Sequence, residues 1–216
     1  MYLPAHFREE RLDVLHTFIR EHGFATLVTQ ASDGLSADHI PLLLNAEAGP
    51  KGTLRGHVAR ANPVWKRAQP DSEVLVIFQG ANGYVTPSWY ATKRETGKVV
   101  PTWNYAAVHV HGPLRAIDDA EWLRNLVTDL TKVHESQFAQ PWHVTDAPAD
   151  FVDQMLKAIV GIEIPIARIE GKWKVSQNRP SVDREGVKAA LRASGKPTDA
   201  AMADMVAAAE KPAGGH

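Results

Sequence analysis

Short runs of β-branched and apolar residues recur along the chain at the spacing of β-hairpins, and this pattern constrains the fold most strongly. There are about seven such runs before residue 180, separated by turn signals such as Asp33-Gly34 and the stretch at residues 80–83. Helices are predicted between them. The regular strand–helix alternation of a parallel sheet is missing, so the pattern favours an antiparallel barrel or sandwich. We predict a mainly β protein of the α+β class with flanking helices.

The predicted helices have recognisable boundaries. Residues 8–22 place apolar side chains on one face and end at Gly23, and residues 118–135 begin with Asp118 and Glu121 in the spacing of a capping box. A further helix is predicted over residues 150–159. The rest of the chain, residues 181–216, is rich in alanine, which predicts a helical C-terminal extension with a flexible end.

The charge balance and the lack of cysteine exclude several classes of function. The 24 Lys and Arg residues against 25 Asp and Glu residues give a formal net charge of −1, so no overall basic field attracts nucleic acid or an acidic membrane. Without cysteine there is no disulfide, thiolate metal site, cysteine nucleophile or iron–sulfur cluster. No apolar run approaches the roughly 20 residues that span a bilayer, and the N-terminus lacks a signal core. We therefore expect a cytoplasmic protein without a membrane segment.

The first candidate site is the stretch Arg60-Ala61-Asn62-Pro63, where a predicted strand meets a short predicted helix capped by Asn62. Free N–H groups at the start of the helix and the guanidinium of Arg60 can converge on a phosphate group. A surface arginine beside an ordinary capped helix accounts for the same residues.

Histidines form a second candidate. His109 and His111 lie two residues apart on a predicted strand and therefore share a face, with His39, His57 or His134 as further ligands of a metal ion. Two histidines on one strand face are more often hydrogen-bonded residues than metal ligands, so we predict no metal site.

Aromatic and basic clusters form the third candidate. Residues 84–90 and 101–105 combine Tyr and Trp with Pro, Thr, Ser and Asn, which suits a planar heteroaromatic ligand, a subunit interface or core packing. Residues 172–180 concentrate three cations with amide and hydroxyl groups after a predicted strand. Dinucleotide, P-loop and Gly-x-Ser-x-Gly motifs are absent from the sequence.

Together these clusters resemble the PaiB-type family of FMN-binding negative transcriptional regulators. The matching stretches, in the expected order within residues 1–190, are residues 1–7, 38–42, 56–63, 84–90, 100–105, 108–112 and 172–180. The resemblance implies an FMN-binding split barrel over residues 1–180, in a homodimer that binds FMN in clefts at the subunit interface.

The resemblance also assigns roles to individual residues. Arg60 and Asn62 are expected near the phosphate of FMN, and His39 and His57, on neighbouring strands, are expected to line the site. Thr102, Trp103 and Asn104 are expected to face the isoalloxazine ring. Lys174, Gln177 and Asn178 are expected on an arm that reaches into the partner's site.

Two functions follow from the resemblance. The first is a negative transcriptional regulator in which the flavin is a sensor or a structural ligand, and the alternative is an FMN-dependent oxidoreductase or flavin reductase. A haem-binding relative ranks third. No helix-turn-helix is evident, and the extension after residue 180 carries five basic residues against five acidic ones, so charge does not support binding to DNA.

Overall fold

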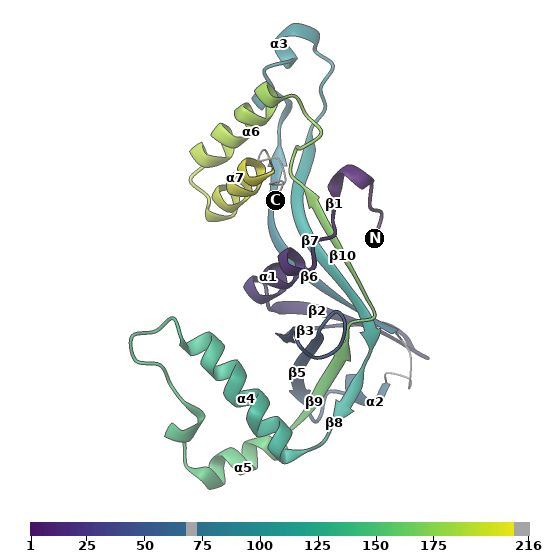
Figure 1. The fold of residues 1–216 in the computed structure, drawn as a ribbon, viewed down its shortest axis with the longest axis vertical. Coiled ribbons are helices and arrows are strands. Elements are labelled where there is room, and N and C mark those ends of the chain that lie inside the picture. Colours follow the sequence, from purple (N-terminus) through teal and green to yellow (C-terminus); the bar gives the residue numbers. More distant parts are fainter. Residues whose placement is uncertain (68–72, 210–216) are drawn as a thin grey trace. The chain divides into compact units, whose positions relative to one another are not determined.

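The computed structural model describes residues 1–67 and 73–209, which divide into two compact units (Figure 1). The first unit comprises Met1–Leu15, Gln79–Val108 and the described part of Glu170–His216, and the second comprises His16–Phe78 and His109–Ile169. Four elements, α1 (Leu12–Glu21), β6 (Glu73–Val85), β7 (Thr102–Pro113) and β10 (Arg168–Lys174), contribute residues to both units. The flexible end predicted at residues 212–216 lies outside the described residues.

In the first unit, four strands follow one another in the order β1-β10-β7-β6. The short β1 (Arg8–Glu9) pairs antiparallel with β10 (Arg168–Lys174), and this pairing explains why the helix predicted from residue 8 begins only at Leu12. Three short helical segments belong to the same unit: η1 (Ala5–Phe7), η2 (Pro87–Trp89) and α3 (Lys93–Thr96).

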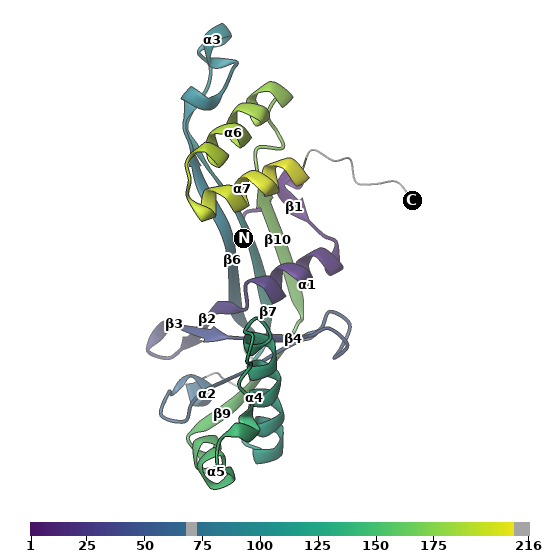
Figure 2. The same ribbon diagram turned by 90° about the vertical axis from the view of Figure 1, so that its left-hand side faces the viewer.

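The C-terminal helices α6 (Ser181–Ala193) and α7 (Pro197–Ala208) lie side by side in the first unit (Figure 2). They share a hydrophobic core with the end of β6 and with the residue that follows β10; its buried members are Val85, Tyr90, Val175, Val187, Leu191, Met202, Ala203 and Val206. The buried carboxylate of Asp183 accepts hydrogen bonds from the backbone N–H and the hydroxyl of Thr92 and fixes the start of α6.

The turn predicted at residues 80–83 is wrong, because β6 runs without interruption from Glu73 to Val85. Gly83 serves helix packing instead of a turn. A Cβ atom at this position would lie 3.3 Å from Leu191 Cδ2 and 3.7 Å from Met202 Cγ, so glycine allows α6 and α7 to approach the strand.

In the second unit, β2 (Phe24–Ala31) and β3 (Gly34–Pro41) form the hairpin predicted from Asp33-Gly34, with Ala31 opposite Gly34. Gly34 has a φ of 116°, a conformation that glycine adopts readily. On its other edge β2 pairs with β6, with Thr26 opposite Ile77. The order in this part of the sheet is therefore β6-β2-β3.

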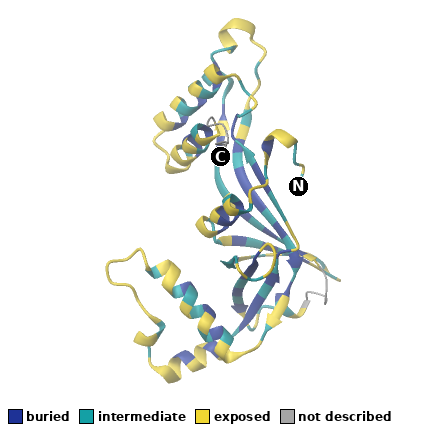
Figure 3. Cartoon of the chain, viewed as in Figure 1, coloured by how far each residue is buried: buried dark blue, intermediate teal, exposed yellow. Residues whose placement is uncertain are grey.

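A second antiparallel sheet has the order β4-β5-β9-β8 and consists of β4 (Leu43–Asn45), β5 (Thr53–Ala59), β9 (Ile159–Pro165) and β8 (Arg115–Ile117). The chain from Gly34 to Asn45 is thus divided between two sheets. The break falls at Leu42, which is buried and whose backbone N–H donates to the carbonyl oxygen of Gly23 at 2.8 Å. Leu54, Gly56 and Val58, at alternate positions of β5, are buried, as a half-buried strand requires. Figure 3 shows that buried residues are concentrated in the strands and exposed residues on the helices.

Two helices, α4 (Ala120–Glu135) and α5 (Ala149–Lys157), pack on each other through Leu123, Val152 and Leu156. Trp122 adds a contact with the second sheet, because a Cβ atom at Gly161 would lie 2.3 Å from its ring. The cap of α4 is Asp119, whose carboxylate accepts from the N–H of Trp122 at 2.7 Å, and not the predicted Asp118. The short helices α2 (Val64–Arg67) and η3 (Val144–Asp146) complete this unit.

The predicted class, a mainly antiparallel β protein with flanking helices, is confirmed. Within residues 1–67 and 73–209, none of the helices combines the length and apolarity needed to cross a membrane.

Candidate functional site

The ten predicted site residues fall into two sets, one in each compact unit. The second unit contains the set on β3, on β5 and between β5 and α2: His39, His57, Arg60 and Asn62. The first unit contains the set at the start of β7 and at the end of β10 and beyond: Thr102, Trp103, Asn104, Lys174, Gln177 and Asn178.

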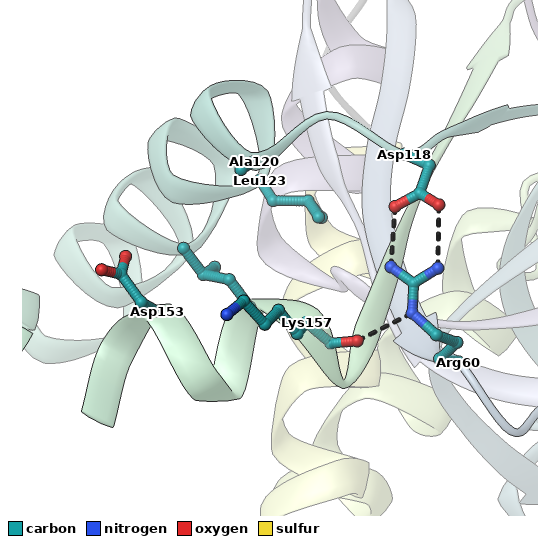
Figure 4. Close-up of a pocket in the computed structure, with 7 residues that line it drawn as sticks. Arg60, Asp118, Ala120, Leu123, Asp153 and Lys157 are labelled. Carbon is teal, nitrogen blue, oxygen red and sulfur yellow. Dashed lines mark hydrogen bonds and ion pairs between the residues drawn. The ribbon is translucent and has the colours of Figure 1, made fainter. Parts of the chain in front are cut away.

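Arg60 is engaged by partners within the second unit (Figure 4). Its guanidinium donates to both carboxylate oxygens of Asp118, at 2.8 and 2.7 Å, and to the backbone carbonyl oxygens of Lys157 at 2.7 Å and Ile159 at 3.0 Å. The hydrogen bonds and charge of this ion pair lower the pKa of Asp118 and raise the pKa of Arg60. A phosphate at Arg60 must therefore compete with a carboxylate.

A pocket of about 280 Å³ opens beside this ion pair, and Figure 4 shows the side chains that line it. Its charged members are two cations, Arg60 and Lys157, and two carboxylates, Asp118 and Asp153. Asp153 also accepts a hydrogen bond from Arg124. The pocket consequently has no excess of positive charge.

Asn62 lines a different pocket of about 340 Å³ in the same unit. Its side-chain oxygen accepts from the N–H of Val64 at 2.9 Å and so caps α2 as predicted, and its amide nitrogen donates to Asp38 at 2.6 Å. Arg60 and Asn62 therefore have different partners and line different pockets in this structure. The reason is that Arg60 turns toward the carboxylate and carbonyl oxygens at the starts of β9 and α4, whereas Asn62 turns toward β3.

Thr29 and Ser36 also line the Asn62 pocket, and neither is among the site residues predicted from the sequence. The hydroxyl of Thr29 is buried and has no hydrogen-bond partner among the residues that the structure describes. An orphaned hydroxyl facing an acidic and an amide side chain fits a ligand that carries hydroxyl groups of its own.

His39 and His57 lie on β3 and β5, which belong to different sheets but contact each other. His39 is exposed and its Nδ1 lies 3.1 Å from the hydroxyl of Thr26. His57 is partly buried opposite Gly161, on the sheet face that Trp122 covers. Burial lowers the pKa of His57, and its Nδ1 has no partner in the described parts of the chain.

In the first unit, Lys174 joins the predicted arm to the predicted ring-binding residues. Its ammonium donates to the hydroxyl of Thr102 and, at 2.6 Å, to the carbonyl oxygen of Trp103. Burial lowers the pKa of Lys174, and the neighbouring cations Lys172 and Arg179 lower it further. An electron-rich ligand here would relieve this repulsion.

Two large aromatic rings are exposed on β6 and β7 of this unit. The side chain of Trp103 is 55% exposed and that of Tyr84 is 47% exposed, and their rings meet edge to face with centroids 5.7 Å apart. Exposed rings beside a half-buried ammonium suit a planar heteroaromatic molecule with polar edges.

Asn104 and Gln177 make hydrogen bonds to other residues of the chain. Asn104 is 1% exposed and its amide donates to the hydroxyl of Ser176 at 2.9 Å, while the side chain of Gln177 accepts from the N–H of Val175 at 2.8 Å. Together they hold the turn after β10, in which Ser176 adopts a left-handed φ of 64°. Asn178 is exposed. Ser176 is a further residue that is not among those predicted from the sequence.

Each set, taken by itself, contains side chains that suit a part of FMN. The first unit offers exposed rings and an ammonium for the isoalloxazine, and the second offers the orphaned hydroxyl of Thr29 for the polyol and the guanidinium of Arg60 for the phosphate. The described residues of one chain therefore contain a candidate partner for each part of FMN.

Comparison with known proteins gives the family. Residues 1–168 match the family model described as "Putative FMN-binding domain". The chain is 32% identical to the Bacillus subtilis "Protease synthase and sporulation protein PAI 2" over 206 residues, which cover 95% of this chain and 96% of that protein. It is 35% identical over 241 residues to an uncharacterized protein of Emericella nidulans, with 95% and 96% coverage.

Solved structures share the fold at low sequence identity. The FAD and haem binding protein of Mycobacterium smegmatis is 14% identical, with a TM-score of 0.57 and coverage of 77% of this chain and 73% of that one. The flavocytochrome Anf3 of Azotobacter vinelandii is also 14% identical, with a TM-score of 0.52 and coverage of 77% and 69%. These matches confirm the predicted split-barrel fold class, and the family model confirms the predicted cofactor class, FMN. The chain belongs to the FMN-binding, PaiB-like family of flavoproteins.

Proposed function

We propose that this chain binds FMN through the two sets of side chains described above and acts as a negative transcriptional regulator, with the flavin as a sensor or structural ligand. The observation that carries the proposal is the half-buried ammonium of Lys174, which donates to the hydroxyl of Thr102 and to the backbone carbonyl oxygen of Trp103, a residue whose side chain is exposed. FMN, when bound, supplies reversible redox chemistry, and the side chains bind and orient it.

Lys174 has a donor left for the flavin. A lysine ammonium carries three N–H donors, and Thr102 and Trp103 accept two of them. The hydroxyl proton of Thr102 also stays available, because its oxygen is the acceptor in that bond. These two donors can meet acceptor atoms at the edge of the isoalloxazine, while Trp103 and Tyr84 contact its face.

The ribityl chain and the phosphate belong in the second unit. Thr29, Ser36 and Asn62 offer donors to a polyol, and Asp38 accepts from its hydroxyl groups. The phosphate takes Arg60 from Asp118. This exchange costs little, because the ion pair is exposed, with side-chain exposures of 37% and 59%, and a guanidinium fork matches phosphate as well as carboxylate.

A homodimer accounts for the use of both sets. We propose that the set around Lys174 completes the FMN site of a second copy, as the predicted arm implies. The regulatory role is proposed from the resemblance to the PaiB-type family, to which the Bacillus subtilis relative "Protease synthase and sporulation protein PAI 2" is similar. The net charge of −1 favours regulation through a partner over direct binding to DNA.

The test of FMN binding is a fluorescence titration of the full chain with FMN. We expect Lys174→Met to weaken binding about tenfold, since it removes a charge-assisted hydrogen bond. Lys98→Met, an exposed lysine of the same unit, is the matched control and should bind FMN as the original chain does. Equal affinity in the two variants would refute the role of Lys174.

Regulator and oxidoreductase are separated by two assays on the FMN-loaded protein. A regulator should consume NADH or NADPH no faster than free FMN does, and loss of the protein in a cell should raise transcription of its target genes. Turnover of many equivalents of NADH per flavin would instead establish the alternative, an FMN-dependent oxidoreductase.

A further inference from the structure

The second unit contains a larger cavity, of about 510 Å³, that the proposed flavin site does not use. It lies between the end of α1, the start of β4, β5 and the C-terminal half of α4. The residues that line it are Arg20, Gly23, Leu42, Leu43, Leu44, Arg55, Asp129, Lys132, Val133, His134 and Ser136. None of the ten predicted flavin-site residues is among them.

The cavity carries an excess of positive charge. Three permanent cations, Arg20, Arg55 and Lys132, face a single carboxylate, Asp129, which leaves a formal excess of two positive charges (3 − 1). Over residues 1–67 and 73–209, neither the guanidinium of Arg20 nor the ammonium of Lys132 makes a hydrogen bond or an ion pair. Two cations are therefore available to a ligand.

Arg55 is only partly satisfied by its neighbours. Its Nη2 lies 3.2 Å from Asp129 Oδ2, and its side chain is 23% exposed. Its Nε is buried and lacks a hydrogen-bond partner in the described part of the chain. Glu163 stands opposite Arg55 across β5 and β9, but it does not line the cavity. A partly buried guanidinium with a free donor is a good partner for an incoming anion.

Capping of α4 does not explain the cations at its end. Lys132 and His134 lie in its last turn, where basic residues often neutralise free carbonyl groups. Here the carbonyl oxygens of Lys132 and Val133 accept from the backbone N–H and the hydroxyl of Ser136, at 3.2 and 2.8 Å, and that of His134 accepts from Gln137 at 3.0 Å. The carbonyl groups are satisfied without the basic side chains.

Part of the lining is apolar and firmly placed. Leu42, Leu43, Leu44 and Val133 contribute this surface. Leu42 is buried, and the hydrogen bond from its N–H to the carbonyl oxygen of Gly23 fixes the backbone between β3 and β4. The volume lies within the range of about 300–1,000 Å³ that small-molecule sites occupy.

We propose that this cavity is a second ligand site, which binds a small organic anion with a carboxylate or phosphate group on an apolar body. Arg20, Arg55 and Lys132 bind the anionic group, and the leucines and Val133 contact the apolar body. The site is independent of flavin binding.

Calorimetric titration of the full chain with octanoate, octanamide and inorganic phosphate tests the proposal. Octanoate has the charge and the apolar body, octanamide has the body alone, and phosphate has the charge alone. We expect octanoate to bind at least about tenfold more tightly than either other compound. Equal binding of octanoate and octanamide, or no binding of octanoate, would overturn the proposal.

The double variant Arg20→Gln/Lys132→Gln changes two exposed side chains and should leave the fold intact. We expect it to lose octanoate affinity by about tenfold or more, while Arg115→Gln, an exposed arginine of the same unit outside the cavity, keeps it. FMN affinity should be the same in all three proteins, so failure of this proposal and failure of the flavin proposal are distinguishable. Wild-type octanoate affinity in the double variant contradicts the assignment.

Discussion

At the scale of the residue, the chemistry depends on which polar groups already have partners. Arg60 binds a carboxylate and two carbonyl oxygens, whereas Thr29 has a buried hydroxyl with no partner in the described residues. Lys174 lies between these cases, since two of its three donors are used and its pKa is lowered by burial. These differences decide what each residue can offer to FMN.

The exchange of Arg60 between Asp118 and phosphate is testable with riboflavin, which lacks the phosphate. We expect Arg60→Ala to weaken FMN binding about tenfold and leave riboflavin binding unchanged. Asp118→Asn should tighten FMN binding, because the guanidinium no longer has a charged competitor. The measurement is flavin fluorescence quenching. An unchanged FMN affinity in both variants would show that Arg60 only holds Asp118 and the neighbouring carbonyl groups in place and does not bind the phosphate.

The lowered pKa of Lys174 predicts how FMN binding depends on pH. An acceptor atom of the flavin favours the protonated amine, so affinity should be constant while Lys174 is protonated. It should fall as the pH rises through the lowered pKa, below the usual range for lysine. Lys174→Met should remove this alkaline decrease. A profile that is the same in the variant contradicts the assignment.

At the scale of the element, sequence patterns predicted most helices and strands but failed where packing decides. The turn expected at residues 80–83 is strand, since Gly83 is needed for the close approach of α6 and α7 and not for a bend. The cap of α4 is Asp119, one residue beyond the predicted one, which leaves Asp118 to Arg60. Sequence alone does not reveal such tertiary contacts.

The roles of several predicted site residues also depend on tertiary contacts. Polar residues near a predicted strand end were predicted to bind the flavin, and of these Asn104 and Gln177 hold the turn after β10. Burial separates a ligand-binding amide from a structural one, and burial is set by contacts between distant segments. Thr29 was missed for the same reason, because a threonine within a strand carries no signal of an unpaired hydroxyl.

The packing of α4 on the second sheet requires glycine at position 161. A Cβ atom there would meet the ring of Trp122 at 2.3 Å, so Gly161→Ala should destabilise the protein by about 1–3 kcal/mol. Combining it with Trp122→Leu should recover part of that loss, because the smaller side chain makes room. Urea unfolding of the two single variants and the double variant measures the coupling, and strictly additive losses would contradict the contact.

At the scale of the whole molecule, the proposed homodimer predicts complementation between two defective variants. Arg60→Ala damages one set of side chains and Lys174→Met the other. If each FMN site takes its two sets from two subunits, mixed dimers contain one intact site, and random mixing restores about a quarter of all sites. Fluorescence titration of the refolded mixture measures this fraction. A mixture that binds no better than the separate variants would place both sets in one chain or exclude the dimer.

The central claim, that these side chains bind FMN, is tested most directly by a visible absorption spectrum of the protein after incubation with FMN and desalting. The account predicts retained flavin bands, at about one FMN per chain, and their loss in the Trp103→Ala/Lys174→Met double variant. A protein that emerges colourless, or a double variant that retains as much flavin as the original chain, would contradict it.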